Sequence, residues 1–564
     1  MHSVLKTTPL IFAGLAALMN PAAANDANLI LYNGNIITMN ENQPAATALA
    51  ISGNHILVVG DVSLAEKFST DKTRRIDLQG KTVIPGLVDT HIHAIRGGQT
   101  YTSETYWYNE TKLPDALKTL QEAAAKKQPD QWVAVVGSWL PEQFEENRAP
   151  TVAELSKAVP DHPVYVQYLY DYALLNEKGI ETLKLNEADP ALPQGIQVER
   201  DANGKATGKL LGHIGSYNAL FAKMMPADRE QQLQSMQVFF SALNSAGMTG
   251  FIDPSAGPSS AYENLFALQM DGKLTLRAGY RIPAMQSGTE AEWFKSLMAF
   301  RQPYYDTGMV SFLGIGESIV AAMNDGVQMG PGFTSPQAAK DELRKVAQFA
   351  AQRRIPLEIH AYTDDAASDI LTVFEDVNTT YPLQDLRWSL AHLNTGSEAT
   401  LERMKKLGLS YTVQMGPYFE GPAILKANGE DIAAKSPPTR AATDKNILVA
   451  GGTDSTRIGI YGIWQAIEYH VTGRSLGGVI QKAEDQLLSR EEALALYTKN
   501  AAWISFAEQN RGTLETGKQA DLAVLDQPYL TVPAEEIDKI RSVLTIVDGK
   551  IVHENLTETP AAAQ

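Results

Sequence analysis

Five apolar, strand-like segments of the chain end in side chains that bind divalent metal ions well. The segments are VIPGLVDTHIH, VSFLGIGE, IPLEIH, LRWSLAH and NILVAGGTD, and the candidate ligands at their ends are His91, His93, Glu317, His360, His392 and Asp454. In an extended chain the side chains at i and i+2 point the same way, so His91 and His93 can face one point. Imidazole and carboxylate ligands suit zinc and similar ions. If these ends meet, the sequence predicts a metal site.

Each candidate ligand also has an ordinary interpretation. Paired histidines occur on solvated strand faces, and His360 or His392 alone could be a hydrogen-bonded core histidine. Asp454 could cap a turn or a helix, and Glu317 could lie in solvent or at the start of a helix. The metal hypothesis therefore depends on all five segments ending in suitable ligands together.

The elements that would bring these ends together alternate along the middle of the chain. Helical segments such as REQQLQSMQVFFSALNSAG, SPQAAKDELRKVAQFAAQRR and ATLERMKKLG separate the apolar runs. Alternating strands and helices indicate a parallel sheet, open or closed. In a closed parallel α/β barrel the carboxyl ends of all strands converge on one face, so ligands distant in sequence can meet there.

Composition limits the classes of function. The chain has 564 residues, a formal charge of −17 and no cysteine. The acidic balance argues against a nucleic-acid partner, because phosphate binding needs clustered lysine and arginine. Without cysteine, a metal site must use histidine and carboxylate ligands, and disulfides are excluded.

The first 24 residues predict a secretory signal peptide. Lys6 supplies a positive start, PLIFAGLAALM an apolar core too short to span a membrane, and Ala22–Ala24 a small-residue cleavage site. The alternative is an N-terminal membrane anchor. We expect export to the periplasm or the medium, with no membrane contact after cleavage.

Several motifs together resemble the amidohydrolase superfamily. They are IPGLVDTHIH, histidines after the fifth and sixth barrel strands, an aspartate after the eighth, and the tail RGTLETGKQADLAVLD. AGMTGFIDPS resembles a third-strand motif of the amidohydrolase family 3 branch, which includes N-substituted formamide deformylase. The resemblance covers roughly residues 28 to 555.

The resemblance implies an α/β fold, a (β/α)8 TIM-like barrel with a composite β-sandwich built from both termini and an α/β insertion. The expected parts are the sandwich strands of residues 25–83, a hydrolase barrel over 84–510 with the insertion at about 100–235, and the rest of the sandwich with the tail over 511–564.

The resemblance also implies roles for the ligands. His91 and His93 would bind the more buried ion with Asp454, and His360 and His392 the more exposed one. Asp454 would act as general base and then as general acid in metal-dependent hydrolysis.

The bridging position after the fourth strand departs from the superfamily pattern. A carboxylated lysine often stands there, whereas VSFLGIGE contains no lysine and offers Glu317 instead. The site could thus hold one or two ions, with zinc as the expected metal.

Six residues are candidates for substrate contacts: Trp139, Gln143, Tyr170, Tyr172, Tyr418 and Arg457. Ordinary packing is the alternative for the first five. Tyr172 stands where relatives of this branch often have histidine. Arg457 could bind a substrate carboxylate or be a loop charge.

The predicted function is hydrolysis of a carbon–nitrogen bond in a small molecule, an amide, an N-acyl or N-formyl amine, or a cyclic amide. The alternatives are ester hydrolysis or decarboxylation on the same scaffold, and a non-catalytic binding or regulatory protein. The sequence leaves the oligomeric state open, and a homo-oligomer is compatible with it.

Overall fold

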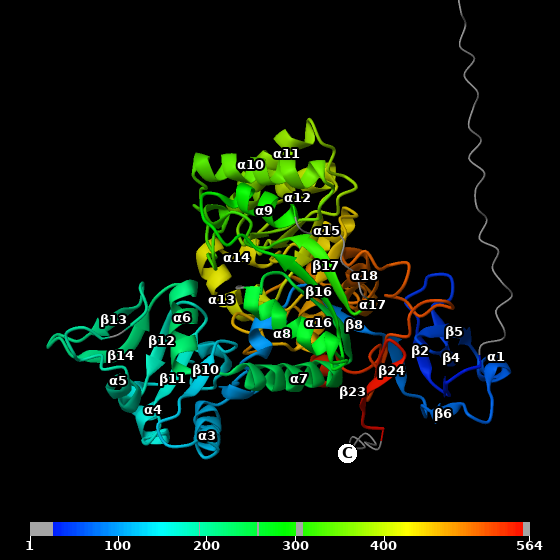
Figure 1. The fold of residues 1–564 in the computed structure, drawn as a ribbon, viewed down its shortest axis with the longest axis horizontal. Helices are drawn as coiled ribbons and strands as arrows, with labels where there is room; N and C mark the ends of the chain where they lie inside the picture. Colours follow the sequence, from blue (N-terminus) through cyan, green and yellow to red (C-terminus); the bar gives the residue numbers. More distant parts are fainter. Residues whose placement is uncertain (1–25, 191, 257–258, 300–307, 557–564) are drawn as a thin grey trace, which may run out of the picture.

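Eight parallel strands form the centre of the computed structural model, which describes residues 26–190, 192–256, 259–299 and 308–556 (Figure 1). They are β8 (Leu87–Asp89), β15 (Met248–Asp253), β16 (Arg277–Ile282), β17 (Val310–Ile315), β18 (Glu358–Ala361), β19 (Ser389–His392), β20 (Ser410–Val413) and β21 (Val449–Gly451). One four-stranded sheet has the order β17-β16-β15-β8 and a second the order β18-β19-β20-β21. The predicted signal peptide lies outside the described residues.

The two sheets are arranged as a TIM-barrel-like α/β fold. No continuous ladder joins them in the described part of the chain. At one seam a single parallel bridge connects Ile315 with Leu357, and at the other the Thr90 N–H donates to the Gly451 carbonyl at 3.0 Å. The carboxyl ends of the eight strands thereby face the same region.

One strand assignment from the sequence was wrong. The motif AGMTGFIDPS contains β15, and β15 pairs directly with β8. It is therefore the second strand of the series and not the third, because the chain leaves β8, forms the insertion and returns beside the strand that it left.

Helices follow most of these strands and bury apolar faces against them: α7 (Arg229–Ser245), α8 (Ser259–Met270), α9 (Glu290–Ala299), α10 (Gln337–Gln352), α11 (Asp364–Asn378), α12 (Glu398–Leu407), α13 (Gly416–Asn428), α15 (Thr439–Asp444), α16 (Ile463–Thr472), α17 (Arg490–Leu496) and α18 (Lys499–Ile504). The sequence fixes their ends locally. Ser397 caps α12 by accepting from the Thr400 N–H, and Gly408 ends it with a φ of 71°. No helix of the described ranges is long and apolar enough to cross a membrane.

Strands from both ends of the chain share one sheet. β2 (Asn35–Ile37), β3 (Ala45–Ala46) and β7 (Thr82–Pro85) pair with β22 (Leu522–Leu525), β23 (Ser542–Val547) and β24 (Lys550–Glu554). A second sheet contains β1 (Leu29–Tyr32), β4 (Ala48–Ser52), β5 (His55–Gly60) and β6 (Arg74–Asp77). Leu31 and Leu49 from one sheet and Leu522 and Leu544 from the other lie in one buried cluster, so the two sheets share a core.

A separate α/β unit lies between β8 and β15 and projects to one side of the molecule (Figure 1). Its six-stranded sheet contains β9 (Glu104–Thr105), β10 (Val133–Val136), β11 (Val164–Tyr168), β12 (Tyr172–Leu175), β13 (Gln197–Arg200) and β14 (Ala206–Leu211). Its helices are α3 (Leu113–Ala124), α4 (Val152–Ala158), α5 (Glu177–Thr182) and α6 (Ile214–Met224). We call this unit the insertion.

Candidate metal centre

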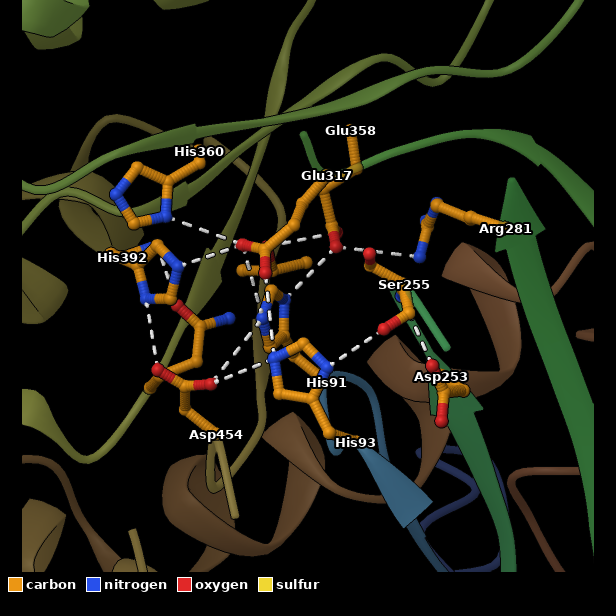
Figure 2. A network of polar contacts seen from close by, with 12 residues as sticks. His91, His93, Asp253, Ser255, Arg281, Glu317, Glu358, His360, His392 and Asp454 are labelled. Carbon is orange, nitrogen blue, oxygen red and sulfur yellow. Dashed lines mark hydrogen bonds and ion pairs between the residues drawn. The ribbon is translucent and has the colours of Figure 1, made fainter. Parts of the chain in front are cut away.

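Glu317 lies among four histidines at the carboxyl ends of the parallel strands (Figure 2). Its Oε2 is 3.0 Å from His392 Nε2, 3.3 Å from His360 Nδ1 and 3.4 Å from His91 Nε2. Its Oε1 is 3.4 Å from His93 Nε2. The structure thus brings together the four histidines that the sequence placed on three different strand ends.

Asp454 completes the cluster from the loop after β21. Its Oδ1 lies 3.3 Å from His93 Nε2 and 3.9 Å from His91 Nε2, and its Oδ2 lies 3.8 Å from His392 Nδ1. All six predicted ligands therefore surround one small volume, and each is less than 10% exposed.

The donor atoms fit a metal ion. Ligand atoms about 2.1 Å from a tetrahedral zinc lie roughly 3.4 Å from one another. Among the described residues, two sets have donor atoms that all lie within 4.8 Å of one another, and the ion would draw them closer: His91 with His93 and Asp454, and His91 with Glu317 and His392. His91 Nε2 and His392 Nδ1 are also buried without a hydrogen-bond partner, which is costly unless an ion or water completes the site.

A set of hydrogen bonds, which we call the tie, joins the end of β8 to the loop after β21 and fixes the positions of His91 and Asp454. Asp89 accepts from the His91 N–H at 3.0 Å and from the Thr453 N–H and Oγ1 at 3.1 and 2.7 Å. The Asp454 N–H in turn donates to the His91 carbonyl at 2.8 Å. This buried tie fixes the two loops relative to each other.

A residue that follows β15 fixes the orientation of His93. His93 Nδ1 lies 3.1 Å from the Ser255 carbonyl, so Nε2 is directed at the cluster. Asp253 holds the same loops by accepting from the Ser255 N–H at 3.0 Å and the Ile95 N–H at 2.8 Å.

Two of the ligands occupy strained backbone. His392 has a φ of 73° and Asp454 a φ of 56°, a region that side chains other than glycine rarely adopt. Both are held by buried contacts: the His392 carbonyl accepts from the Tyr411 hydroxyl at 2.8 Å. Such strain is concentrated at functional sites.

Mutual pairing sets the charge state of the cluster. Burial by itself raises the pKa of Glu317, but the nearby His91, His360 and His392 hold it well below its usual range. Burial opposes the charge of Asp454 too, yet His93 and His392 keep the pKa of that carboxyl below its ordinary value. Both carboxylates are therefore ionised at neutral pH and can act as metal ligands.

Glu358 is a site residue that the sequence analysis missed. It is fully buried, and its Oε1 lies 3.0 Å from His91 Nδ1. Its Oε2 accepts from the hydroxyls of Ser389 at 3.0 Å and Thr412 at 2.9 Å. This contact fixes the His91 tautomer with Nε2 facing the cluster. The signal was present in IPLEIH, since Glu358 precedes His360 by two residues and shares its face of the strand.

Asp325 and Tyr362 were also missed. Asp325 lies 3.2 Å from His360 Nε2 and accepts from the N–H groups of Tyr362 and Thr363. The Tyr362 ring stacks on His392 with centroids 4.6 Å apart, and its hydroxyl lies 3.4 Å from Asp454 Oδ2. Asp325 stands in a loop without a strand pattern, so no sequence signal indicated it.

A cavity of about 180 Å³ opens above the cluster. Of the six predicted substrate contacts, Tyr170 and Arg457 line it. Arg457 pairs with Glu104 of the insertion at 2.8 Å, so its charge is balanced.

The other four lie away from this cavity. Trp139 is fully buried against Trp107 and donates to the Gln167 carbonyl, and Gln143 donates to backbone carbonyls of the insertion. Tyr172 packs beside Tyr168 under the Lys209 ammonium, and Tyr418 beside Tyr469.

Comparison with known proteins agrees with this geometry. A family model described as the amidohydrolase family matches residues 74–553. N-substituted formamide deformylase of Arthrobacter pascens is 24% identical over 550 residues, covering 93% of this chain and 98% of that protein.

Two solved structures have similar folds. An uncharacterized metal-dependent hydrolase from Pyrococcus horikoshii OT3 superposes with a TM-score of 0.65 at 20% identity, covering 90% of this chain and 99% of that one. Atrazine chlorohydrolase TrzN from Arthrobacter aurescens TC1, complexed with zinc, gives a TM-score of 0.52 at 16% identity, covering 94% and 97%. At these identities the likeness concerns the fold.

Proposed function

The chain belongs to the amidohydrolase family, and we propose that this metal-dependent hydrolase cleaves the carbon–nitrogen bond of an amide in a small molecule. The single observation that carries the proposal is the cluster of four histidines with Glu317 and Asp454 on the floor of a cavity. N-substituted formamide deformylase, a relative over nearly its whole length, supports the choice of bond by its name.

A divalent metal held by these residues would supply a Lewis acid that activates water and polarises the scissile carbonyl. Asp454 is placed to take the proton from the attacking water, because its Oδ1 faces the cluster and its pKa is held low. The same carboxyl would then deliver that proton to the leaving nitrogen. Tyr362, beside Asp454 Oδ2, would orient the carboxylate.

We propose that the four histidines, Glu317 and Asp454 would hold two zinc ions, with Glu317 contributing one carboxylate oxygen towards each. Its two oxygens face different histidines, Oε1 towards His93 and Oε2 towards His360 and His392. The zinc-bound structural neighbour is consistent with this choice of metal. Metal analysis of the purified protein should give two zinc ions per chain.

The remaining proposals concern export and the architecture of the chain. The predicted signal peptide supports export, the strand order supports one (β/α)8 barrel, and the shared core of the terminal sheets supports a composite β-sandwich.

A substrate screen tests the function. The zinc-loaded protein should hydrolyse N-formyl or N-acyl amines faster than matched esters, measured by release of the amine or alcohol. Asp454→Asn should lower kcat by ~10² to ~10⁴ while the fold is kept, because a carboxamide cannot accept the proton. The exposed Asp71→Asn serves as the control.

Two results would contradict the proposal. Turnover like that of the wild type in the Asp454 variant would remove the proton-transfer role. A protein that binds no divalent metal, and is not activated by added zinc, would indicate a binding or regulatory function.

A further inference from the structure

Two arginines line the cavity above the metal centre, Arg96 and Arg457. They differ in their partners. Arg457 is nearly buried, pairs with Glu104 and lies over the Phe221 ring at 4.9 Å. The Nε of Arg457 is buried without a hydrogen-bond partner too, but the ion pair with Glu104 already balances the charge of this guanidinium.

Arg96 has no such partner. No hydrogen bond or ion pair of its side chain is found among the described residues, and its Nε is buried without a partner. Arg96 influences the charge of Asp253, but that carboxylate is already engaged by the N–H groups of Ile95 and Ser255. Arg96 is only partly buried, so its unpaired N–H donors can reach an anion in the cavity.

The backbone fixes Arg96 relative to the reacting centre. It lies in the short helix α2 (Ala94–Gly98), three residues after the N-cap residue His93, and both side chains line the cavity. A Cβ on Gly97 would come within 2.5 Å of Thr456 Oγ1, so α2 packs tightly against the loop that carries Asp454. Arg96 therefore cannot move far from the cluster.

The cavity wall also presents apolar side chains, beside the polar Ser255, Ser318 and Asn324. Ile214 and Tyr170 come from the insertion, and Val327 and Ile458 come from loops of the barrel-like domain. A ligand that fits this cavity carries an anionic group for Arg96 and an apolar group for these side chains. The net charge of −17 repels anions at long range, but screening over about 10 Å leaves the local attraction dominant.

We propose that Arg96 binds a carboxylate of the substrate and so selects amides of the N-acyl amino acid class. This inference rests on the proposed amide hydrolysis at the same site. A guanidinium suits the role because it can donate two parallel hydrogen bonds to one carboxylate.

A matched pair of substrates tests the proposal. Racemic N-acetylvaline and N-isobutylacetamide share the amide and the branched side chain and differ in the carboxylate. The zinc-loaded wild type should favour N-acetylvaline. Arg96→Gln should lower the ratio of the two kcat/KM values by ~10-fold to ~100-fold, the effect of losing a charged hydrogen-bond pair, and mainly through KM. Arg96→Lys should recover part of the ratio. Arg353→Gln, which removes the exposed arginine at the C-cap of α10, should leave the ratio unchanged.

Binding supplies a second readout. In the zinc-loaded Asp454→Asn protein, calorimetry should show N-acetylvaline binding that the added Arg96→Gln change weakens by a similar factor. Equal binding with and without Arg96 would mean that the carboxylate ligates the metal alone, and would overturn the proposal. An equal loss for both substrates would overturn it as well, since it would indicate a structural role. If neither substrate is hydrolysed, the proposed amide hydrolysis fails, while the binding measurement still decides the role of Arg96.

Discussion

Two buried histidines of this protein have opposite environments. His360 lies in the metal cluster and His470 on α16, and both are less than 10% exposed. Burial alone would lower the pKa of His360, but Asp325 and Glu317 raise it to about 10. Burial lowers the pKa of His470 to about 3, and the nearby Lys482 adds to the effect. Burial therefore does not distinguish a ligand from a core histidine, whereas a carboxylate in contact with the ring does.

Lys482 extends the contrast. Its ammonium is buried and bonds the Pro437 carbonyl at 3.0 Å, and burial lowers its pKa to about 7. In the cluster each buried base faces an acid. Around His470 and Lys482 the charge is removed by deprotonation instead.

The largest effect is expected from removing the central acid of the cluster. Glu317→Gln replaces a carboxylate that contacts four histidines with a neutral amide, so metal should be lost and kcat/KM should fall by about 10³ or more. Measurements of zinc content and of turnover test this prediction. Glu342→Gln, another buried glutamate on α10, is the matched control and should keep both. A Glu317 variant with full zinc content would show that this carboxylate is not a ligand.

Glu358 acts one contact away from the metal. Glu358→Gln should lower zinc affinity or activity by about 10-fold to 100-fold, because the amide no longer fixes the His91 tautomer. Competition with a chelator gives the affinity. Ser389→Ala removes one hydroxyl donor from the same carboxylate and should have a smaller effect. If the two variants behaved alike, the contact between Glu358 and His91 would not be the reason for the loss of zinc affinity or activity.

The smallest expected effect is a change with pH in the contribution of Lys482 to the free energy of unfolding. The unfolded state keeps an ordinary lysine pKa near 10.5, whereas the folded state has about 7. Between these values the unfolded chain binds the extra proton, so this residue makes the protein more stable as pH rises. Lys482→Met removes the trend, and the stability of the wild type relative to the variant should rise by up to about 1.4 kcal/mol per pH unit.

Urea unfolding at pH 7, 8, 9 and 10 measures that slope. Lys118→Met, on the exposed side of α3, is the control for a lost charge without burial. A constant difference between wild type and the Lys482 variant over this range would mean that the buried lysine keeps its proton in the folded protein.

The convergence of the six candidate ligands could be predicted from the sequence because each of them ends an apolar run, and parallel strands bring such ends together. Glu358 could have been found by the same rule, since it lies two residues before His360. Asp325 and Arg96 could not, because a loop carboxylate and a short-helix arginine carry no periodic signal. Trp139 and Gln143 were placed at the pocket mouth because an aromatic residue in a strand pattern gives no indication of which core it enters. The insertion has a core of its own that contains Trp139, and Gln143 donates to backbone carbonyls of the insertion.

The tie between Asp89 and Thr453 has a consequence for the order of events during synthesis. The two residues lie 364 positions apart in the sequence. His91 and His93 are therefore synthesised long before their carboxylate partner Asp454. Until β21 docks beside β8, Asp89 lacks its hydroxyl donor and the first two histidines lack half of their ligand set. Metal capture is therefore a late step, completed only by nearly full-length chains, and a fragment ending before Thr453 would hold histidines without a site.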